Sequence, residues 1–241
     1  MLKKCIIVLF GLICIWQIVV FAFSLPDYLL PGPIDVFKCL FVNYRLLAME
    51  AWVTILETFA GLFLGVTLGM ICALGMAHFR VIRYWMMPVL ILSQAIPTFI
   101  FAPILIIWFG YGISSKVAIT VFSLFFPVAA SFFDGLTRTN RGWLELASTM
   151  QCTERRILWF IKLPAALPSL ASGIRVAVAW APMAAVIGEW VGSSRGLGFL
   201  MVNANVRMDI NLMFASLIVL VAFSLFLYFT VDVLLKKLIT W

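Results

Sequence analysis

The chain has 241 residues, of which 65% are hydrophobic and only 11% are charged. Soluble domains carry about 25% charged residues, so this composition excludes a soluble enzyme and indicates an all-α membrane protein with several spans. The net charge of +7 does not indicate a nucleic-acid partner, because membrane proteins concentrate Lys and Arg on their cytoplasmic side. The sequence contains no Cys/His cluster and no G-x-x-x-x-G-K-[ST], so it predicts neither a metal site nor an ATP site.

Six apolar segments are predicted to cross the membrane within a single domain, 1–241. The first covers 5–25, after Lys3 and Lys4, and a proline-rich outer loop follows it. The others cover 52–77, 86–109, 117–133, 171–190 and 210–235. Eleven Lys and Arg residues fall in segments predicted inside and five in segments predicted outside, which places both termini in the cytoplasm.

Two spans have distinctive compositions. The second contains Gly61, Gly65 and Gly69 at four-residue spacing, and small residues in this pattern allow a neighbouring helix to approach closely. The third contains three prolines, which predict kinks and freed backbone carbonyls. The glycine pattern favours helix packing, and a span with several prolines is tolerated where it packs on protein or lines a polar path.

A long polar loop, 134–168, is predicted on the cytoplasmic side. Its charged part runs from Glu145 to a predicted break at Leu163-Pro164, and Ile157, Phe160 and Ile161 recur in it at helical spacing. Two interpretations fit an isolated loop of this kind: a solvated connector with orienting charges, or an amphipathic helix that docks on a partner.

The spacing within this loop resembles a cytoplasmic motif of ABC importer permeases: EAA, three residues, Gly, nine residues, I-x-L-P. Glu145, Ala147, Ile161, Leu163 and Pro164 fall in register. Leu146 replaces the first Ala, and Gln151 replaces the Gly. Because a left-handed conformation is costly for Gln, we expect the turn at Gln151 to differ in shape.

Further segments resemble the permeases of nitrate, sulfonate, taurine and thiamine-precursor pyrimidine importers. They include 95–97, 103–110, 125–127, 163–168 with 173–175, and Glu189 with 196–198. The resemblance implies a type I ABC importer permease fold with a cytoplasmic coupling helix. It further implies a permease homodimer in the lipid of a bacterial inner membrane, with a cytosolic ABC ATPase dimer that binds ATP and Mg and an extracytoplasmic substrate-binding protein. The chain itself would need no cofactor and would not be an enzyme.

The same resemblance implies functional residues. ATPase coupling is assigned to Glu145, Ala147, Gln151, Arg155, Ile161, Leu163 and Pro164. A substrate path between the two permease copies, lined by spans three to five, is assigned to Ser93, Gln94, Trp180 and Glu189. Alternatively, Trp180 only packs and Glu189 only pairs with Arg195. The stretch 29–36 favours a thiamine-precursor pyrimidine or a similar small aromatic as substrate, with nitrate, sulfonate or taurine as alternatives.

Two other classes of membrane protein fit the sequence less well. A secondary transporter would use intramembrane ionisable groups, and the candidates Glu57, Arg175, Glu189 and Asp232 all lie near predicted span ends. An integral membrane enzyme would need a nucleophile with a base, or grouped metal ligands, and His78 is the only histidine in the sequence. Both classes are therefore less well supported than the importer.

Overall fold

The computed structural model describes the chain except residues 1, 25, 27, 240 and 241, and it leaves the side chains of 2–10, 12, 94 and 95 undescribed. The described residues form helices joined by short turns, with no strand among them. The helices are α1 (Leu2–Ala22), α2 (Pro33–Val42), α3 (Tyr44–His78), α4 (Arg80–Ala95), the 3-10 turn η1 (Thr98–Phe101), α5 (Ala102–Phe109), α6 (Ile113–Thr137), α7 (Arg141–Thr149), α8 (Glu154–Ile157), the π turn η2 (Leu158–Lys162), α9 (Leu163–Gly192), α10 (Leu197–Val206) and α11 (Ile210–Leu238).

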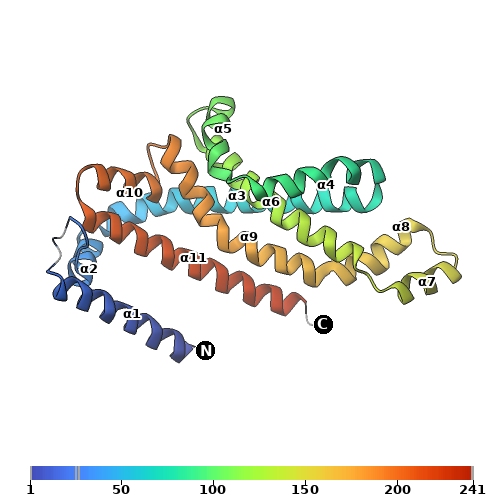
Figure 1. Ribbon diagram of the computed structural model, residues 1–241, viewed down its shortest axis with the longest axis horizontal. Helices are drawn as coiled ribbons and strands as arrows, with labels where there is room; N and C mark the ends of the chain where they lie inside the picture. Colours follow the sequence, from blue (N-terminus) through green and yellow to red (C-terminus); the bar gives the residue numbers. More distant parts are fainter. Residues whose placement is uncertain (1, 25, 27, 240–241) are drawn as a thin grey trace.

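Three long helices, α3, α6 and α9, form the centre of the molecule, and α6 packs along both of the others (Figure 1). The close approach of α3 and α6 depends on glycine. A Cβ added to Gly61 would collide with Thr120, and one added to Gly65 would lie 3.1 Å from the Cβ of Leu124. Phe132 is fully buried in the core between these helices. The predicted packing role of the glycine stripe is confirmed.

The predicted spans correspond in order to α1, α3, the pair α4–α5, α6, α9 and α11. Among the described residues, α3, α6, the run from α8 to α9, and α11 are long and apolar enough to cross a membrane, and α4 with α5 forms one further bent pair. α1 has 21 residues, and at 1.5 Å per residue this length matches a hydrocarbon core of about 30 Å. The helices extend beyond most of the predicted bounds: α3, for example, already begins at Tyr44.

The third predicted span, 86–109, is broken, whereas the sequence predicted a kinked helix. The segment Arg80–Ser93 of α4 and the segment Thr98–Phe109, which comprises η1 and α5, are bent by 104° relative to each other. Ile96, which precedes Pro97, has an extended backbone with φ −101° and ψ 121°, because the proline ring disfavours helical angles in the preceding residue. Pro88 lies inside α4, and Pro103 lies in the first turn of α5, where a helix needs no amide hydrogen. Only one of the three prolines therefore lies at the break.

The two ends of the molecule differ in character. One end carries α2 and α10, and the other carries α7 and α8 (Figure 1). α1 runs away from the α7–α8 end and α11 runs toward it. α11 is fastened to α9 by Arg175, whose Nε donates a 2.7 Å hydrogen bond to Asp232. Asp232 also accepts a 2.6 Å bond from Lys236, so both charged residues predicted near these span ends have protein partners.

Candidate functional site

α7 is a short helix at one end of the molecule, outside the membrane-length helices (Figure 1). It begins at Asn140, whose side-chain oxygen accepts a 2.9 Å hydrogen bond from the amide of Gly142 and so caps the helix. Ala147 faces the protein and is 3% exposed, whereas Trp143 and Leu146 are 55% and 62% exposed. α7 therefore presents apolar side chains that no described part of this chain covers.

The turn after α7 contains a left-handed residue, Gln151, with φ 55°. Its amide donates a 3.0 Å bond to the carbonyl of Ser148, and the amide of Cys152 donates a 3.0 Å bond to the carbonyl of Ala147. These two bonds form the Schellman termination that glycine usually permits. The expectation of a differently shaped turn is therefore wrong. The backbone bonds hold Gln151 in a conformation that costs a residue with a Cβ about 1–2 kcal/mol.

After this turn the chain is helical from α8 through α9 without interruption. The predicted break at Leu163-Pro164 does not occur, and within 134–168 only 138–140 and 150–153 are irregular. Pro164 lacks an amide hydrogen, and its ring would clash with the carbonyl of Phe160 in a regular α-helix. The π turn η2 immediately precedes Pro164 and widens the helix at this place.

An apolar groove, called here the α7 groove, lies between α7, the end of α6, and the η2–α9 junction. Its volume is about 720 Å³. Its walls include Trp143, Leu146, Met150, Phe160, Ile161 and Pro164. Phe160 is 78% exposed and Met150 is 69% exposed, so these walls are open to solvent. The groove has the size and apolar lining that suit insertion of side chains from a partner protein.

The structure brings three of the residues assigned to ATPase coupling to this groove: Ala147, Ile161 and Pro164. Glu145 lies on the exposed face of α7, and Gln151 shapes the turn. The three groove residues belong to α7 and to the η2–α9 junction, and not to the single docking helix expected from the sequence.

The remaining two residues assigned to coupling lie elsewhere. Leu163 packs against the central core, and Arg155 borders a different groove, beside Trp159. Trp143, Leu146 and Met150 were not assigned to the site. Their spacing of three and four residues would have predicted an apolar face on α7.

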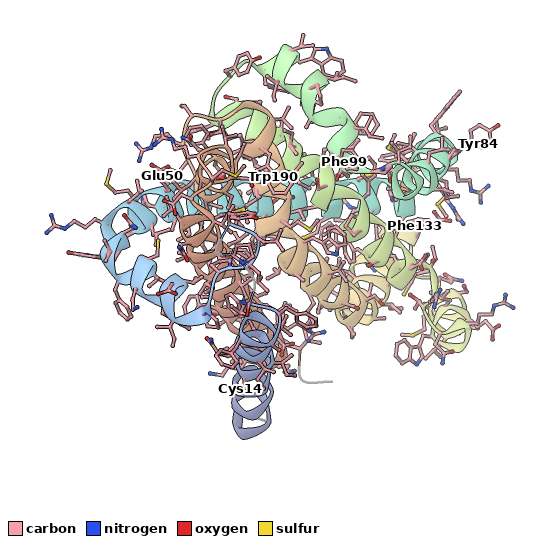
Figure 2. The ribbon with its side chains drawn as sticks, turned by 60° about the vertical axis from the view of Figure 1, so that its left-hand side comes forward. Cys14, Glu50, Tyr84, Phe99, Phe133 and Trp190 are labelled. Atoms are coloured by element: carbon pink, nitrogen blue, oxygen red, sulfur yellow. The ribbon has the colours of Figure 1, made fainter. Side chains whose placement is uncertain are left out.

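The opposite end contains a buried polar cluster, formed by Glu50, Thr54, Glu57, Lys116 and Glu189. Each of these residues is at most 9% exposed. They come from three helices, α3, α6 and α9. Figure 2 labels Glu50 and Trp190 in this region, where α3, α9 and α10 meet. Buried polar groups are costly unless they are bonded, so their partners decide what the cluster does.

Glu189 joins three helices through its two carboxylate oxygens. Oε1 accepts a 2.7 Å hydrogen bond from the hydroxyl of Thr54, and Oε2 accepts a 2.5 Å bond from the amide of Gly198. The hydroxyl of Thr54 in turn accepts a 2.9 Å bond from the amide of Leu197. These amides begin α10 and have no partner within that helix, so the cluster caps the α10 N-terminus.

Glu50 completes the cap. Its carboxylate accepts a 2.6 Å hydrogen bond from the amide of Gly196 and a 3.2 Å bond from Nε of Arg195. The alternative pairing of Glu189 with Arg195 is therefore wrong: Arg195 pairs with Glu50. Gly196 has φ 109°, and a Cβ there would collide with the carboxyl group of Glu189.

Glu57 and Lys116 form a buried ion pair between α3 and α6, with 3.0 Å between Oε1 and Nζ. Their side chains are 0% and 6% exposed. Lys116 was predicted in an outer turn, but it lies inside the first turn of α6. Because the ammonium neutralises a carboxylate that would otherwise be buried alone, the pair explains how Glu57 is tolerated in a span.

Three of the four residues assigned to the substrate path have described side chains, and these three lie in different surroundings. The hydroxyl of Ser93 donates a 2.8 Å bond to the carbonyl of Leu90 within α4. The side chain of Gln94 lies outside the described residues. Trp180 is 55% exposed on the surface of α9, whereas Glu189 is 1% exposed and both of its oxygens accept bonds from protein groups.

Comparisons with known proteins agree with this architecture. Residues 65–240 match the family model described as binding-protein-dependent transport system inner membrane component. A probable ABC transporter permease protein of Haemophilus influenzae is 48% identical over 238 residues, covering 99% of this chain and 97% of the relative. The formylaminopyrimidine transport permease protein ThiX of Halalkalibacterium halodurans is 35% identical over 231 residues, covering 95% and 92%.

A solved structure has the same fold. The inward-facing MetNI methionine ABC transporter superposes with a TM-score of 0.68 at 20% identity, covering 81% of this chain and 97% of the matched chain. The expected type I importer permease fold is therefore confirmed. The chain belongs to the binding-protein-dependent transport system inner membrane component family and is an ABC transporter permease.

Proposed function

We propose that this chain imports a small solute across a bacterial inner membrane by alternating access, with its α7–α8 end and both termini in the cytoplasm. The observation that carries the proposal is α7, with its exposed apolar face and the α7 groove behind it. The opposite directions of α1 and α11 and the excess of basic residues in predicted inside segments support this orientation.

The partner at the α7 groove is a cytosolic ABC ATPase dimer, which would hold the ATP and Mg. Movement of that partner would pass through Phe160 and Ile161 into the helical run that begins at α8. This run has 39 residues and ends three residues after Glu189. At 1.5 Å per residue its length is about 58 Å, so one rigid element connects the groove to the buried polar cluster.

The complete transporter would contain two copies of this chain and an extracytoplasmic binding protein. Exposed apolar side chains on α5, including Ile107 at 80% and Trp108 at 73%, need lipid or a second copy to cover them. The end that carries α2 and α10 would receive the binding protein. The rigid cap of α10 supports this assignment, because docking needs a preformed surface.

The proposed substrate is a thiamine-precursor pyrimidine. The similarity to a permease named for formylaminopyrimidine transport, over 95% of this chain, supports a small aromatic solute. Taurine, sulfonates and nitrate are the alternatives. Uptake of each radiolabelled solute by vesicles that contain the permease, its ATPase and its binding protein would decide among them.

A secondary transporter is the competing function. Such a protein needs a carboxylate that is free to exchange ions. In the described spans, Glu57 pairs with Lys116, Asp232 with Arg175, and Glu189 binds Thr54 and Gly198. These partners favour a structural role for the carboxylates and so favour the ATP-driven importer.

The deciding experiment is gentle detergent purification of the chain from its own membrane, followed by identification of the chains that co-purify. A P-loop ATPase at one copy per permease supports the proposal. ATP-independent uptake by vesicles that contain this chain alone would refute it and favour the secondary transporter.

A further inference from the structure

A depression distinct from the α7 groove lies at the same end of the molecule, between the α3–α4 corner and the segment from α7 to η2. Its volume is about 300 Å³. His78, Arg80, Arg83, Glu154 and Lys162 line it, and we call it the basic pocket. With histidine neutral, three positive charges face one negative charge there, so the pocket has a net charge of +2.

The cations of the basic pocket have no acidic partner among the described residues. None of the ion pairs in the described part of the chain includes Arg80, Arg83 or Lys162. The guanidinium of Arg83 lies 5.2 Å from the centre of the Phe133 ring, which orients it without neutralising it. α4 also begins at Arg80 without a side-chain cap, which leaves its first amides available to an anion.

An apolar groove of about 340 Å³ adjoins the basic pocket and shares His78 and Leu158 with it. Leu74, Phe79 and Trp159 supply the rest of its apolar lining. Leu74 lies four residues before the end of α3, a helix that is long and apolar enough to cross a membrane, so the groove lies beside one end of a membrane-length helix. A free phosphate ion would use only the basic pocket, whereas an amphiphile with an anionic head would use both.

We propose that the basic pocket binds the phosphate of an anionic phospholipid, of the phosphatidylglycerol type, and that the adjoining groove holds one of its acyl chains. Basic pockets on the cytoplasmic side of membrane helices bind such headgroups. Glu154 in the same wall would accept a hydrogen bond from a headgroup hydroxyl. The inference rests on the proposed function only in placing this end at the cytoplasmic leaflet.

Occupation of this site would connect two parts of the transporter. Arg80 and Arg83 belong to the start of α4, while Lys162 and Glu154 belong to the segment that follows α7. A bound headgroup would bridge these walls and hold the segment that follows α7 against the α3–α4 corner.

The test measures lipid retention by the purified full chain in nanodiscs of mixed phosphatidylglycerol and phosphatidylethanolamine, read by native mass spectrometry. Wild type is compared with Arg80→Gln/Arg83→Gln and with a control, Arg141→Gln/Lys237→Gln, which removes two charges outside the pocket. We expect wild type and control to retain phosphatidylglycerol preferentially. The pocket variant should bind it about 10- to 30-fold more weakly, because two charge contacts are lost.

Several outcomes would overturn the proposal. Equal losses of phosphatidylglycerol binding in both double variants would show that the lipid is attracted by the general positive charge of the chain. Failure of the wild type to prefer phosphatidylglycerol over phosphatidylethanolamine would exclude an anionic lipid as the ligand. Displacement by millimolar inorganic phosphate would identify a free-anion site, and displacement by an added ATPase would identify a protein contact. Should the pocket variant misfold on size exclusion, Lys162→Gln tests the opposite wall. Lipid retention needs neither ATP nor substrate, so its failure is distinct from failure of ATP-driven uptake.

Discussion

The hydroxyl of Thr54 donates a 2.7 Å hydrogen bond to the carboxylate of Glu189, 135 residues further along the chain. The same hydroxyl accepts a bond from the amide of Leu197, and the same carboxylate accepts one from Gly198. α3 and α9 thereby hold the start of α10 from two sides. Because Glu189 lies three residues before the end of the helical run that begins at α8, this bond fixes the far end of the element proposed to transmit movement.

Replacement of Glu189 by alanine should lower the free energy of unfolding by about 2–5 kcal/mol. It leaves the Gly198 amide buried without an acceptor and leaves the Thr54 hydroxyl with only the Glu50 carbonyl, 3.4 Å away. A buried donor without an acceptor costs about 1–3 kcal/mol, and the weakened Thr54 bond adds to that cost. Thermal or denaturant unfolding in detergent, followed by circular dichroism, measures the change. Val191→Ala is the control, because Val191 is 43% exposed and a surface change costs about 0.5 kcal/mol or less. Equal stability of the two variants would contradict the capping role.

The ion pair between Glu57 and Lys116 should show strong energetic coupling. Lys116→Met alone leaves a carboxylate buried without its cation, and removal of one partner from a buried pair costs about 3–5 kcal/mol. The double variant Glu57→Leu/Lys116→Met buries no charge and should recover most of that loss. A double-mutant cycle on unfolding midpoints measures the coupling. A double variant whose loss equals the sum of the single losses would show that the two groups act independently.

The all-α membrane class could be predicted from hydropathy, because long apolar segments indicate membrane helices, whereas the permease fold followed from the resemblance of the motifs. The stripe of Gly61 and Gly65 also indicated a helix contact correctly, although it did not reveal α6 as the partner. The ends of the helices were harder to predict from the sequence. The π turn before Pro164 allows the helix to continue. The presence of a proline in the sequence does not predict whether the helix ends there or continues through such a turn.

The candidate site was predictable only where its residues are close in sequence. The motif from Glu145 to Pro164 covers two of the three elements around the α7 groove, because α7 and the η2–α9 junction belong to one stretch of chain, whereas the end of α6 lies outside the motif. The polar cluster joins Glu50, Lys116 and Glu189, which are far apart in sequence and are brought together by tertiary packing. Arg195 lies closer to Glu189 in sequence but pairs with Glu50, because the turn before α10 directs the Arg195 side chain toward α3.

Gln151→Gly should stabilise the turn after α7 by about 1 kcal/mol. Gln151 is held at φ 55°, which glycine adopts without the steric cost of a Cβ, and this relief exceeds the entropy that glycine gains when unfolded. Gln151→Val should destabilise the turn, because a β-branched residue is disfavoured at positive φ. Hydrogen exchange at the amide of Cys152, which closes the turn on Ala147, reports local opening. Faster exchange in the glycine variant would contradict the strain argument.

Changes on the exposed face of α7 should separate ATP hydrolysis from transport. Glu145→Arg reverses a charge on α7, and Leu146→Glu places a carboxylate in the wall of the α7 groove. Both residues are exposed, so membrane insertion and stability should be preserved. ATP-driven uptake should fall at least about tenfold, because docking on an apolar surface is opposed by a charge that must lose its water. Thr149→Glu is the matched control for Leu146→Glu, because Thr149 is exposed on the same helix but does not line the groove. Uptake and ATPase activity are measured in the same vesicles, with permease levels determined by immunoblot. Wild-type uptake by Glu145→Arg and Leu146→Glu would show that the ATPase docks elsewhere, whereas an equal loss in the Thr149 variant would show that any added acid on α7 disturbs the complex.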